Sequence, residues 1–375
     1  MCGLERCAPV ALGEEWARGA FGSVHVVDTP SAPTGRIAVK RVAETPGHVN
    51  RELETCIRLA LDPHAGIVRV LGYWTEQAEQ AEQQERTLRA LPVVDADPEP
   101  PEGPERPEGP ETLQTLYLVM EFFPETLRGV LDRLAESSMR MKTGRMTSLM
   151  GQLASALGHL EKLGLMHRDM KPDNVLVDVQ TDRLVLCDFG SAKFAERGSG
   201  STRSATYVCT RFYRSPELIL GRDLYSTSVD IWSFGCIVAE FAYGGPLFTG
   251  DTQVEVMSRI IWIRGMVTVD DIAHMPTSVP ESIESLESLE SLSLGLDALC
   301  AAVQQTAARP WSKVFTRRVG KGRRVNASYG AWYEGVLDAC FAMEPWAPRL
   351  CAGPVFASRF SWRFLSFWIF EFLDL

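Results

Sequence analysis

The residues best suited to do chemistry gather in one stretch near the middle of the chain. The run His167-Arg-Asp-Met-Lys-Pro-Asp-Asn174 contains Asp169, Lys171 and Asn174, and the triplet Asp188-Phe-Gly190 follows it. Phosphoryl transfer builds negative charge on the transferred group. It needs a metal on the phosphates, a cation near the γ-phosphate and a carboxylate that orients the hydroxyl nucleophile. The stretch contains side chains of each kind: Asn174 and Asp188 to bind a metal, Lys171 as the cation and Asp169 as the carboxylate.

A glycine-rich turn lies near the N-terminus, at Arg18-Gly-Ala-Phe-Gly-Ser-Val24. A hairpin of this kind lets backbone N–H groups approach the phosphates of a nucleotide, because side chains there would hold the backbone away. The usual first glycine is replaced by Ala17, and a glycine-bearing β-turn with no ligand is the alternative interpretation. The sequence has no GxxxxGK[ST] motif, which excludes a P-loop nucleoside triphosphatase.

Lys40 ends a predicted strand and would face the buried side of the sheet. A buried ammonium group requires an anion, either phosphate oxygens or a carboxylate. Glu52, on the next predicted helix, can supply the carboxylate. A surface lysine and an unrelated helical glutamate are the alternative for either residue taken singly.

The elements that must position these residues change character along the chain, which predicts an α+β fold. The first part is rich in short β-branched runs, and the part after Glu121 has mainly helical periodicity. Strands are expected at 24–27, 37–40, 67–74 and 115–120, and helices at 50–61, 147–163 and 228–243.

Composition indicates a globular chain with one strongly acidic insertion. Hydrophobic residues make up 45% of the 375 residues, which is ample for a sizeable core. The net charge of −10 is concentrated in residues 76–111, which contain eleven acidic side chains, three basic side chains and seven prolines. We expect this insertion to be exposed and largely disordered. Because Arg and Lys occur mostly singly or in pairs, polynucleotide binding is disfavoured.

Nine cysteines without a CxxC pair favour free thiols in a reducing compartment. No secretion signal or transmembrane segment is expected, since the apolar run at residues 364–373 is about half the roughly 20 residues that span a bilayer. A cytoplasmic or nuclear location is therefore expected.

The two central motifs strongly resemble the catalytic and magnesium-binding loops of eukaryotic protein kinases. Ser215-Pro-Glu217 stands where that family has Ala-Pro-Glu, and Asp230-Ile-Trp-Ser-Phe-Gly235 resembles its long helix behind the catalytic loop. The resemblance implies a bilobal fold over residues 10–362, with a β-rich N-lobe to about residue 119 and a helical C-lobe from about residue 120. It also implies ATP as substrate and Mg²⁺ as cofactor.

The resemblance assigns a role to each polar residue of these motifs. Asp169 would be the catalytic base, Lys171 would lie on the γ-phosphate, and Asn174 with Asp188 would hold magnesium. Three further positions would support the loops: Asp230 would bind the backbone of the catalytic loop, and Glu217 would pair with Arg349. Lys171 so close to Asp169 also favours serine or threonine substrates.

The nucleotide site implied by the resemblance draws on both lobes. Lys40, paired with Glu52, would bind the phosphates, and Met120 would be the gatekeeper beside the hinge. The expected ATP-binding residues are Trp16, Ala17, Gly19, Phe21, Gly22, Val24, Ala38, Lys40, Met120, Glu121, Phe123, Leu176 and Cys187.

Within the kinases, the chain resembles the glycogen synthase kinase-3 or shaggy family. The stretches that carry this resemblance are Asn50-Arg-Glu-Leu53, Pro124-Glu-Thr126, Cys187-Asp-Phe-Gly-Ser-Ala-Lys193, Tyr207-Val-Cys-Thr-Arg-Phe-Tyr-Arg-Ser-Pro-Glu217 and Pro310-Trp-Ser-Lys-Val-Phe315. That family recognises substrates already phosphorylated four residues C-terminal to the target. The three cations implied for that phosphate are Arg51, Arg168 and Lys193.

The activation segment implied by the resemblance centres on Tyr207, a phosphorylation site with Arg211 and Arg214 as its partners. A tyrosine packed by its ring is the alternative. Ala205 stands where cyclin-dependent and mitogen-activated relatives carry a threonine that is phosphorylated. Because alanine cannot be phosphorylated, the basic pocket would be left for a primed substrate.

Two other functions stay open from the sequence. One is a proline-directed kinase of a related branch that needs no priming. The other is a kinase-like scaffold without turnover, suggested by Ala17 and by the aromatic tail at residues 363–375. The low-complexity Glu/Ser/Leu tract at 281–297 has no assigned role. Expected partners are protein substrates, with scaffold proteins on the C-lobe as a further option.

Overall fold

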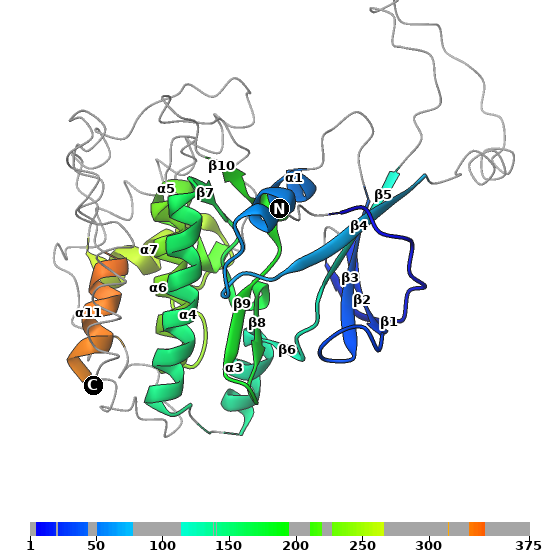
Figure 1. Cartoon of the computed structure of the whole chain (residues 1–375). Coiled ribbons are helices and arrows are strands. Elements are labelled where there is room, and N and C mark those ends of the chain that lie inside the picture. The colour runs from blue at the N-terminus through cyan, green and yellow to red at the C-terminus, as the bar shows by residue number, and fades with distance from the viewer. Residues whose placement is uncertain are drawn as a thin grey trace, which may run out of the picture. The chain divides into compact units, whose positions relative to one another are not determined.

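The computed structural model describes residues 5–19, 22–43, 51–77, 114–137, 139, 141–194, 211–219, 227–265, 314 and 330–341. The chain divides into two compact units: Met1–Pro63 with Arg69–Phe122, and His64–Val68 with Phe123–Leu375. The division falls between Phe122 and Phe123, three residues beyond the expected lobe boundary at about residue 119. Figure 1 labels the elements of both units.

The first unit is built on a five-stranded antiparallel sheet in the order β1-β2-β3-β5-β4. The predicted hairpin, the strand before the hinge and the helix are confirmed, each with slightly different ends. The elements are β1 (Glu14–Gly19), β2 (Gly22–Asp28), β3 (Arg36–Ala43), α1 (Arg51–Leu61), β4 (Val70–Gln77) and β5 (Gln114–Glu121).

The strand predicted at 67–74 is wrong at both ends. Ile67 forms an isolated bridge with Leu186, and the Val68 N–H donates to the Leu186 carbonyl at 2.9 Å, so both belong to the second unit. β4 begins at Val70 and continues to Gln77. The prediction was wrong because an apolar run has the pattern of a single strand even where its residues contact two different sheets.

β4 also takes the first two residues that we expected in the acidic insertion. The Glu76 carboxylate accepts hydrogen bonds from Trp74 Nε1 at 3.2 Å and Tyr117 Oη at 3.0 Å. These bonds hold the end of β4 against β5. The rest of the expected insertion, from residue 78, lies outside the described residues.

The two faces of the sheet carry different clusters, because successive side chains of a strand point to opposite faces. Ile37, Val39, Trp74, Tyr117 and Val119 form a buried cluster on one face. On the other face, Leu116 and Leu118 pack with Cys56 of α1 in a second cluster. Lys40 pairs with Leu118 and so faces α1.

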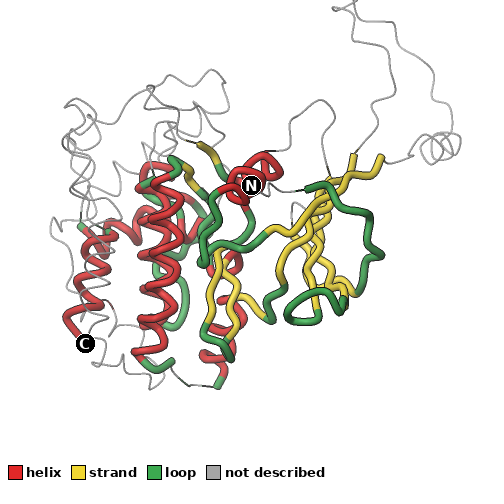
Figure 2. Tube along the Cα trace, viewed as in Figure 1, coloured by secondary structure: helices red, strands yellow, loops and turns green. Residues whose placement is uncertain are grey.

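The second unit is mainly helical, as the red segments of Figure 2 show. Its helices are α3 (Leu127–Glu136), α4 (Thr143–Lys162), α5 (Pro216–Ile219), α6 (Ser228–Tyr243), α7 (Gln253–Arg264) and α11 (Gly330–Cys340), with short 3-10 turns η1 (Pro172–Asn174), η2 (Phe189–Ser191) and η3 (Arg211–Tyr213). Strands β6 (Glu125–Thr126), β8 (Val175–Asp178) and β9 (Arg183–Leu186) form one small sheet, and β7 (Leu165–Met166) pairs with β10 (Lys193–Phe194).

α6 forms the core of this unit and has the bounds predicted from the sequence. Residues 232–240 are all buried, which explains why the helix is apolar around most of its circumference. Trp232 of α6, Phe248 and Phe341 pack their rings together at centroid distances of 4.8 to 5.5 Å. α4 begins four residues before its predicted start.

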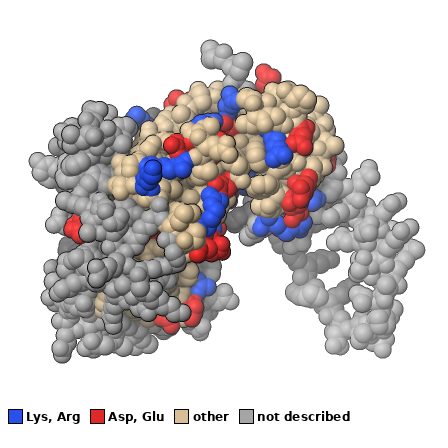
Figure 3. Space-filling view, turned by 90° about the horizontal axis from the view of Figure 1, so that it is seen from below, with Lys and Arg blue, Asp and Glu red and all other residues tan. Residues whose placement is uncertain are grey.

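Charged side chains of both signs are interspersed over the face shown in Figure 3. Ion pairs among the described residues include Arg133 with Glu125 at 2.7 Å and Arg145 with Asp182 at 2.5 Å. None of the helices in the described ranges is long and apolar enough to cross a membrane.

Candidate active site

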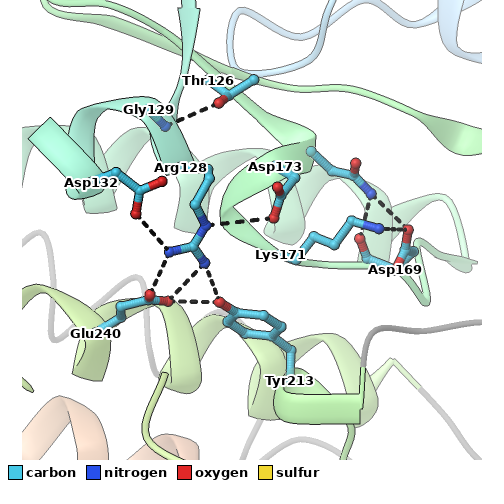
Figure 4. A network of polar contacts seen from close by, with 10 residues as sticks. Thr126, Arg128, Gly129, Asp132, Asp169, Lys171, Asp173, Tyr213 and Glu240 are labelled. Atoms are coloured by element: carbon cyan, nitrogen blue, oxygen red, sulfur yellow. Dashed lines mark hydrogen bonds and ion pairs between the residues drawn. The ribbon is translucent and has the colours of Figure 1, made fainter. Parts of the chain in front are cut away.

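The Asp169 side chain lies at the centre of the polar stretch predicted from the sequence. It is 3% exposed, and its Oδ2 accepts hydrogen bonds from Lys171 Nζ at 2.7 Å and Asn174 Nδ2 at 2.9 Å (Figure 4). The same Asn174 amide donates to the Asp169 carbonyl at 2.8 Å. Asp169 Oδ1 is buried and accepts no hydrogen bond from the described residues. The carboxylate is thus held by one oxygen and keeps the other as an acceptor.

Lys171 stays charged in this environment. Burial by itself would lower the pKa of Lys171, but the hydrogen bond that Lys171 donates to Asp169 and the nearby Asp173 and Asp188 carboxylates raise it further than burial lowers it. The net shift is upward, so the ammonium group is retained at neutral pH. A cation therefore lies beside Oδ2 of Asp169.

The loop that carries Asp169 is anchored by Asp230 at the start of α6. The N–H groups of His167 and Arg168 donate to Asp230 Oδ2 and Oδ1, at 2.7 and 2.8 Å. This is the backbone contact that the resemblance implied for Asp230. Burial raises the pKa of Asp230, and the two N–H groups and their neighbours oppose that rise. Arg168 has a left-handed backbone, with φ of 66°, at this anchored turn.

His167 connects the catalytic loop to the segment that carries Asp188. Its Nδ1 lies 3.3 Å from the Asp169 N–H and accepts from it, so the other ring nitrogen, Nε2, carries the proton and donates to the Cys187 carbonyl at 2.9 Å. The ring also packs edge-on against Phe189 at 5.1 Å. The tautomer is therefore determined by the two backbone partners.

Asn174 and Asp188 are brought near each other by the pairing of β8 with β9. The Cys187 N–H donates to the Asn174 carbonyl at 3.0 Å, which places Asp188 one residue from that contact. The Asn174 amide nitrogen is engaged by Asp169, so its oxygen is the atom left to bind a cation. An amide oxygen and a carboxylate are the hard ligands that Mg²⁺ prefers.

No group of three or more His, Cys, Asp or Glu side chains in the described ranges could hold a metal by itself. This fits a magnesium ion, which commonly binds through one or two protein groups and takes its other ligands from water and substrate phosphates. The Asn174 amide oxygen and the Asp188 carboxylate therefore fit the magnesium ion that the resemblance implies.

In the first unit, Lys40 and Glu52 form the expected ion pair. Their Nζ and Oε1 atoms are 2.5 Å apart, and the side chains are 10% and 7% exposed. Val24 and Ala38 lie on the same face of the sheet as Lys40, and Met120 pairs with Ala38. Val24, Ala38, Lys40 and Met120 thus share one face of the sheet, whereas Glu121 pairs with Ile37 and belongs to the other face.

The glycine-rich turn has an irregular register. β1 pairs with β2 through Ala17 opposite Val24 and Gly19 opposite Gly22, with a shift at Trp16. The Trp16 ring is half-exposed and lies edge-on to Phe122 at 5.5 Å. Phe21 lies outside the described residues.

The remaining expected nucleotide-binding residues lie at the end of the first unit and in the second unit. The Glu121 N–H donates to the Arg69 carbonyl at 3.0 Å, and its carboxylate accepts from the Arg69 N–H at 2.9 Å. Phe123 is buried with Arg183 over its ring, while Leu176 and Cys187 are half-buried in the second unit.

The three cations expected to bind a priming phosphate come from different places. Arg51 is exposed at the first residue of α1, in the first unit. In the second unit, Arg168 Nε donates to the Ser191 carbonyl at 2.6 Å, two residues before Lys193. Lys193 pairs with Met166 in β10 and is half-buried. The structure thus brings Arg168 and the Lys193 segment together.

The predicted activation-segment residues are described only in part. Arg211 is exposed and donates to the Asp251 carbonyl, and Arg214 is buried. Burial raises the pKa of Glu217 to about 7. Ala205, Tyr207 and Arg349 lie outside the described residues, as do the 281–297 tract and the 363–375 tail.

A polar cluster that the sequence pattern did not indicate adjoins the catalytic loop. Arg128 of α3 contacts Tyr213 of η3, Glu240 of α6 and Asp173 of η1 (Figure 4). One signal was present, since Glu240 is an acid within the otherwise apolar second half of α6. Nothing in the sequence around Arg128 indicated these contacts.

The chain matches known proteins in two comparisons. Residues 12–302 match the family model described as Protein kinase domain. The chain is also 34% identical over 269 residues to a glycogen synthase kinase 3 from Trypanosoma brucei brucei. The aligned region covers 70% of this chain and 66% of that relative, which is just under two thirds of the relative's length.

Proposed function

Because the chain belongs to the protein kinase family, we propose that it is an ATP-dependent serine/threonine protein kinase. The observation that carries the proposal is the Asp169 carboxylate, with Oδ2 held by Lys171 and Asn174 and buried Oδ1 left as an acceptor. A kinase needs such an oxygen to orient the hydroxyl group of its substrate and accept the proton.

Each polar residue then has a chemical task. Asp169 Oδ1 accepts the hydroxyl proton as the substrate oxygen bonds to the γ-phosphorus and the bond to ADP breaks. Lys171 offsets the charge of the transferred group, and Lys40 binds the nucleotide phosphates. Asn174 and Asp188 would hold the divalent cation, which when bound neutralises phosphate charge. Preorganised charges of this kind supply most of the catalysis in phosphoryl transfer.

We further infer a preference for substrates that carry a phosphoserine four residues after the target. Arg51, Arg168 and Lys193 are the cations for that phosphate, since a phosphate of almost two negative charges binds arginine in bidentate geometry. The contact of Arg168 with the Ser191 carbonyl, close to Lys193, supports this assignment. So does the similarity to a protein named glycogen synthase kinase 3.

The test measures phosphate incorporation from Mg-ATP into two peptides that differ only in a phosphoserine four residues after the target serine. The wild type should prefer the primed peptide strongly, and Arg51→Ala should remove the preference. Asp169→Asn should abolish transfer to both peptides without a change in Tm. Asp28→Asn, an exposed carboxylate paired with Arg36 in the first unit, is the matched control and should stay active.

The outcomes separate the alternatives. Equal rates for the two peptides would keep the kinase and reject the priming pocket, in favour of a kinase that needs no priming. No transfer by a folded wild type that carries phosphate on Tyr207 would reject the enzyme in favour of a nucleotide-binding scaffold.

A further inference from the structure

Arg128 is a point at which four separate segments of the second unit meet. Its Nη1 donates to Glu240 Oε1 at 2.7 Å, and its Nη2 donates to Tyr213 Oη at 2.5 Å. Tyr213 in turn donates to Glu240 Oε2 at 2.8 Å. Two weaker ion pairs complete the cluster, to Asp173 at 3.8 Å and to Asp132 at 3.6 Å. Figure 4 shows these groups converging on one guanidinium.

The arginine is placed by the start of its helix. Thr126 caps α3 by accepting a hydrogen bond from the Gly129 N–H at 3.2 Å, which fixes the first helical turn. Arg128 lies within that turn. Its side chain leaves α3 toward α6 while its Nε reaches the Asp173 carboxylate.

Glu240 makes the cluster rigid because it is almost completely buried. Its side chain is 1% exposed, and a carboxylate out of water must be paired and hydrogen-bonded. Arg128 supplies the cation and Tyr213 a second donor. Burial alone would lower the pKa of Arg128, but Glu240 raises it more, so the arginine stays charged. Burial and the same carboxylate raise the pKa of Tyr213, which therefore stays a donor.

The η1 turn connects the cluster to the candidate active site. Asp173 lies in η1, next to Asn174, whose amide holds the Asp169 carboxylate. Tyr213 ends η3, and its carbonyl accepts from Ser233 Oγ of α6 at 2.7 Å. α6 thus anchors the catalytic loop directly through Asp230 and, farther along the helix, through Glu240 and Arg128.

We propose that Arg128 is a positioning residue of this site, which ties the η1 turn bearing Asn174 and the η3 turn to the buried Glu240 carboxylate. The proposal rests on the proposed kinase function. Loss of the tie should let η1 move relative to Asp169 and slow the transfer step more than it weakens substrate binding, because small misplacements of a catalytic group are costly.

Two carboxylates offer a matched test. Asp173 and Asp132 both pair with Arg128 at similar distances and are 52% and 59% exposed, but only Asp173 belongs to the catalytic loop. Asp173→Asn should lower kcat about tenfold with KM for ATP and Tm little changed, because an exposed ion pair contributes little stability. Asp132→Asn should leave kcat unchanged. Arg128→Lys, which keeps the charge but loses the planar fork, should also lower kcat.

A double-mutant cycle checks that Asp173 acts through Arg128 and not through its neighbour Lys171. In the Arg128→Met/Glu240→Gln background, which removes the buried charge pair together, Asp173→Asn should cause no further loss of kcat. An undiminished loss in that background would overturn the proposal, as would equal kcat values for Asp173→Asn and Asp132→Asn. A folded wild type without transfer activity would overturn the proposed function and this inference with it.

Discussion

At the scale of single residues, the buried charges constrain this chain most strongly. Counted over all their atoms, Lys40, Glu52, Asp169 and Asp230 are each 8% exposed or less. Each is held by a charged partner or by backbone N–H groups. Such groups destabilise a fold when one partner is removed, since the other is then left charged and out of water. The chemistry proposed for the site explains why the fold contains these buried charges.

The Lys40–Glu52 pair gives the first residue-scale prediction. Glu52→Gln leaves the Lys40 ammonium buried beside a neutral amide and should cost about 3 kcal/mol of unfolding free energy, together with most of the transfer activity. The double variant Lys40→Met/Glu52→Leu should recover the stability but not the activity. Urea unfolding and phosphate incorporation measure the two effects.

Glu54→Gln is the control for that prediction. Glu54 lies on the same helix and pairs with Arg58 at 2.7 Å, but both side chains are exposed. Its loss should change the free energy of unfolding by about 0.5 kcal/mol or less. If Glu52→Gln were as mild as Glu54→Gln, the buried pair would not exist in solution.

At the scale of elements, the β2–β3 hairpin depends on the close approach of two backbones. Gly22 begins β2 with φ of +146°, and a Cβ at this position would lie 1.9 Å from the Arg41 carbonyl oxygen of β3. A side chain would therefore separate the strands. The glycine is required by strand packing as well as by any approach to phosphates.

Gly22→Ala should accordingly destabilise the chain by about 3 kcal/mol, through backbone strain and a clash that only strand separation relieves. Gly35→Ala is the matched control, because Gly35 also has a positive φ, of +73°, but a Cβ there would contact nothing. Its cost should be about 1 kcal/mol from the backbone conformation alone. Thermal unfolding followed by circular dichroism compares the two, and equal losses would contradict the close approach.

At the scale of the whole molecule, stability should depend on pH through Glu217. Burial raises the pKa of its carboxyl group to about 7, above the ordinary value of 4.5. The folded state then binds a proton more tightly than the unfolded state. This contribution to stability is fully present below about pH 4.5 and is lost as the pH rises through about 7.

The expected size of this effect is about 3 kcal/mol between pH 4.5 and pH 8, since one pKa unit corresponds to about 1.4 kcal/mol. Glu217→Gln removes the titrating group, so the free energy of unfolding of the wild type should fall relative to this variant over that range. Denaturant unfolding at a series of pH values measures the difference. A constant difference would mean that a cation keeps Glu217 ionised, and Arg349 is the partner expected from the resemblance.

The sequence by itself determined the parts of this protein that depend on neighbours along the chain. The run from His167 to Asn174 specified the catalytic loop, and the helical pattern of residues 228–243 specified α6. The Lys40–Glu52 contact could also be predicted from the sequence, because a strand and the next helix pack together and a buried lysine needs an anion. The strand at 67–74 was wrong because local pattern does not say which sheet a residue joins.

Only the tertiary structure decided the contacts made over long sequence separations. Arg128 meets Tyr213 and Glu240 from 85 and 112 residues away, and no periodicity links them. The orientation of His167 depends in the same way on a carbonyl 20 residues farther along. Such contacts follow from how α3, α6 and the two 3-10 turns pack. Each buried charge pairs with the group that packing brings next to it. The local sequence around either residue does not show which group that is.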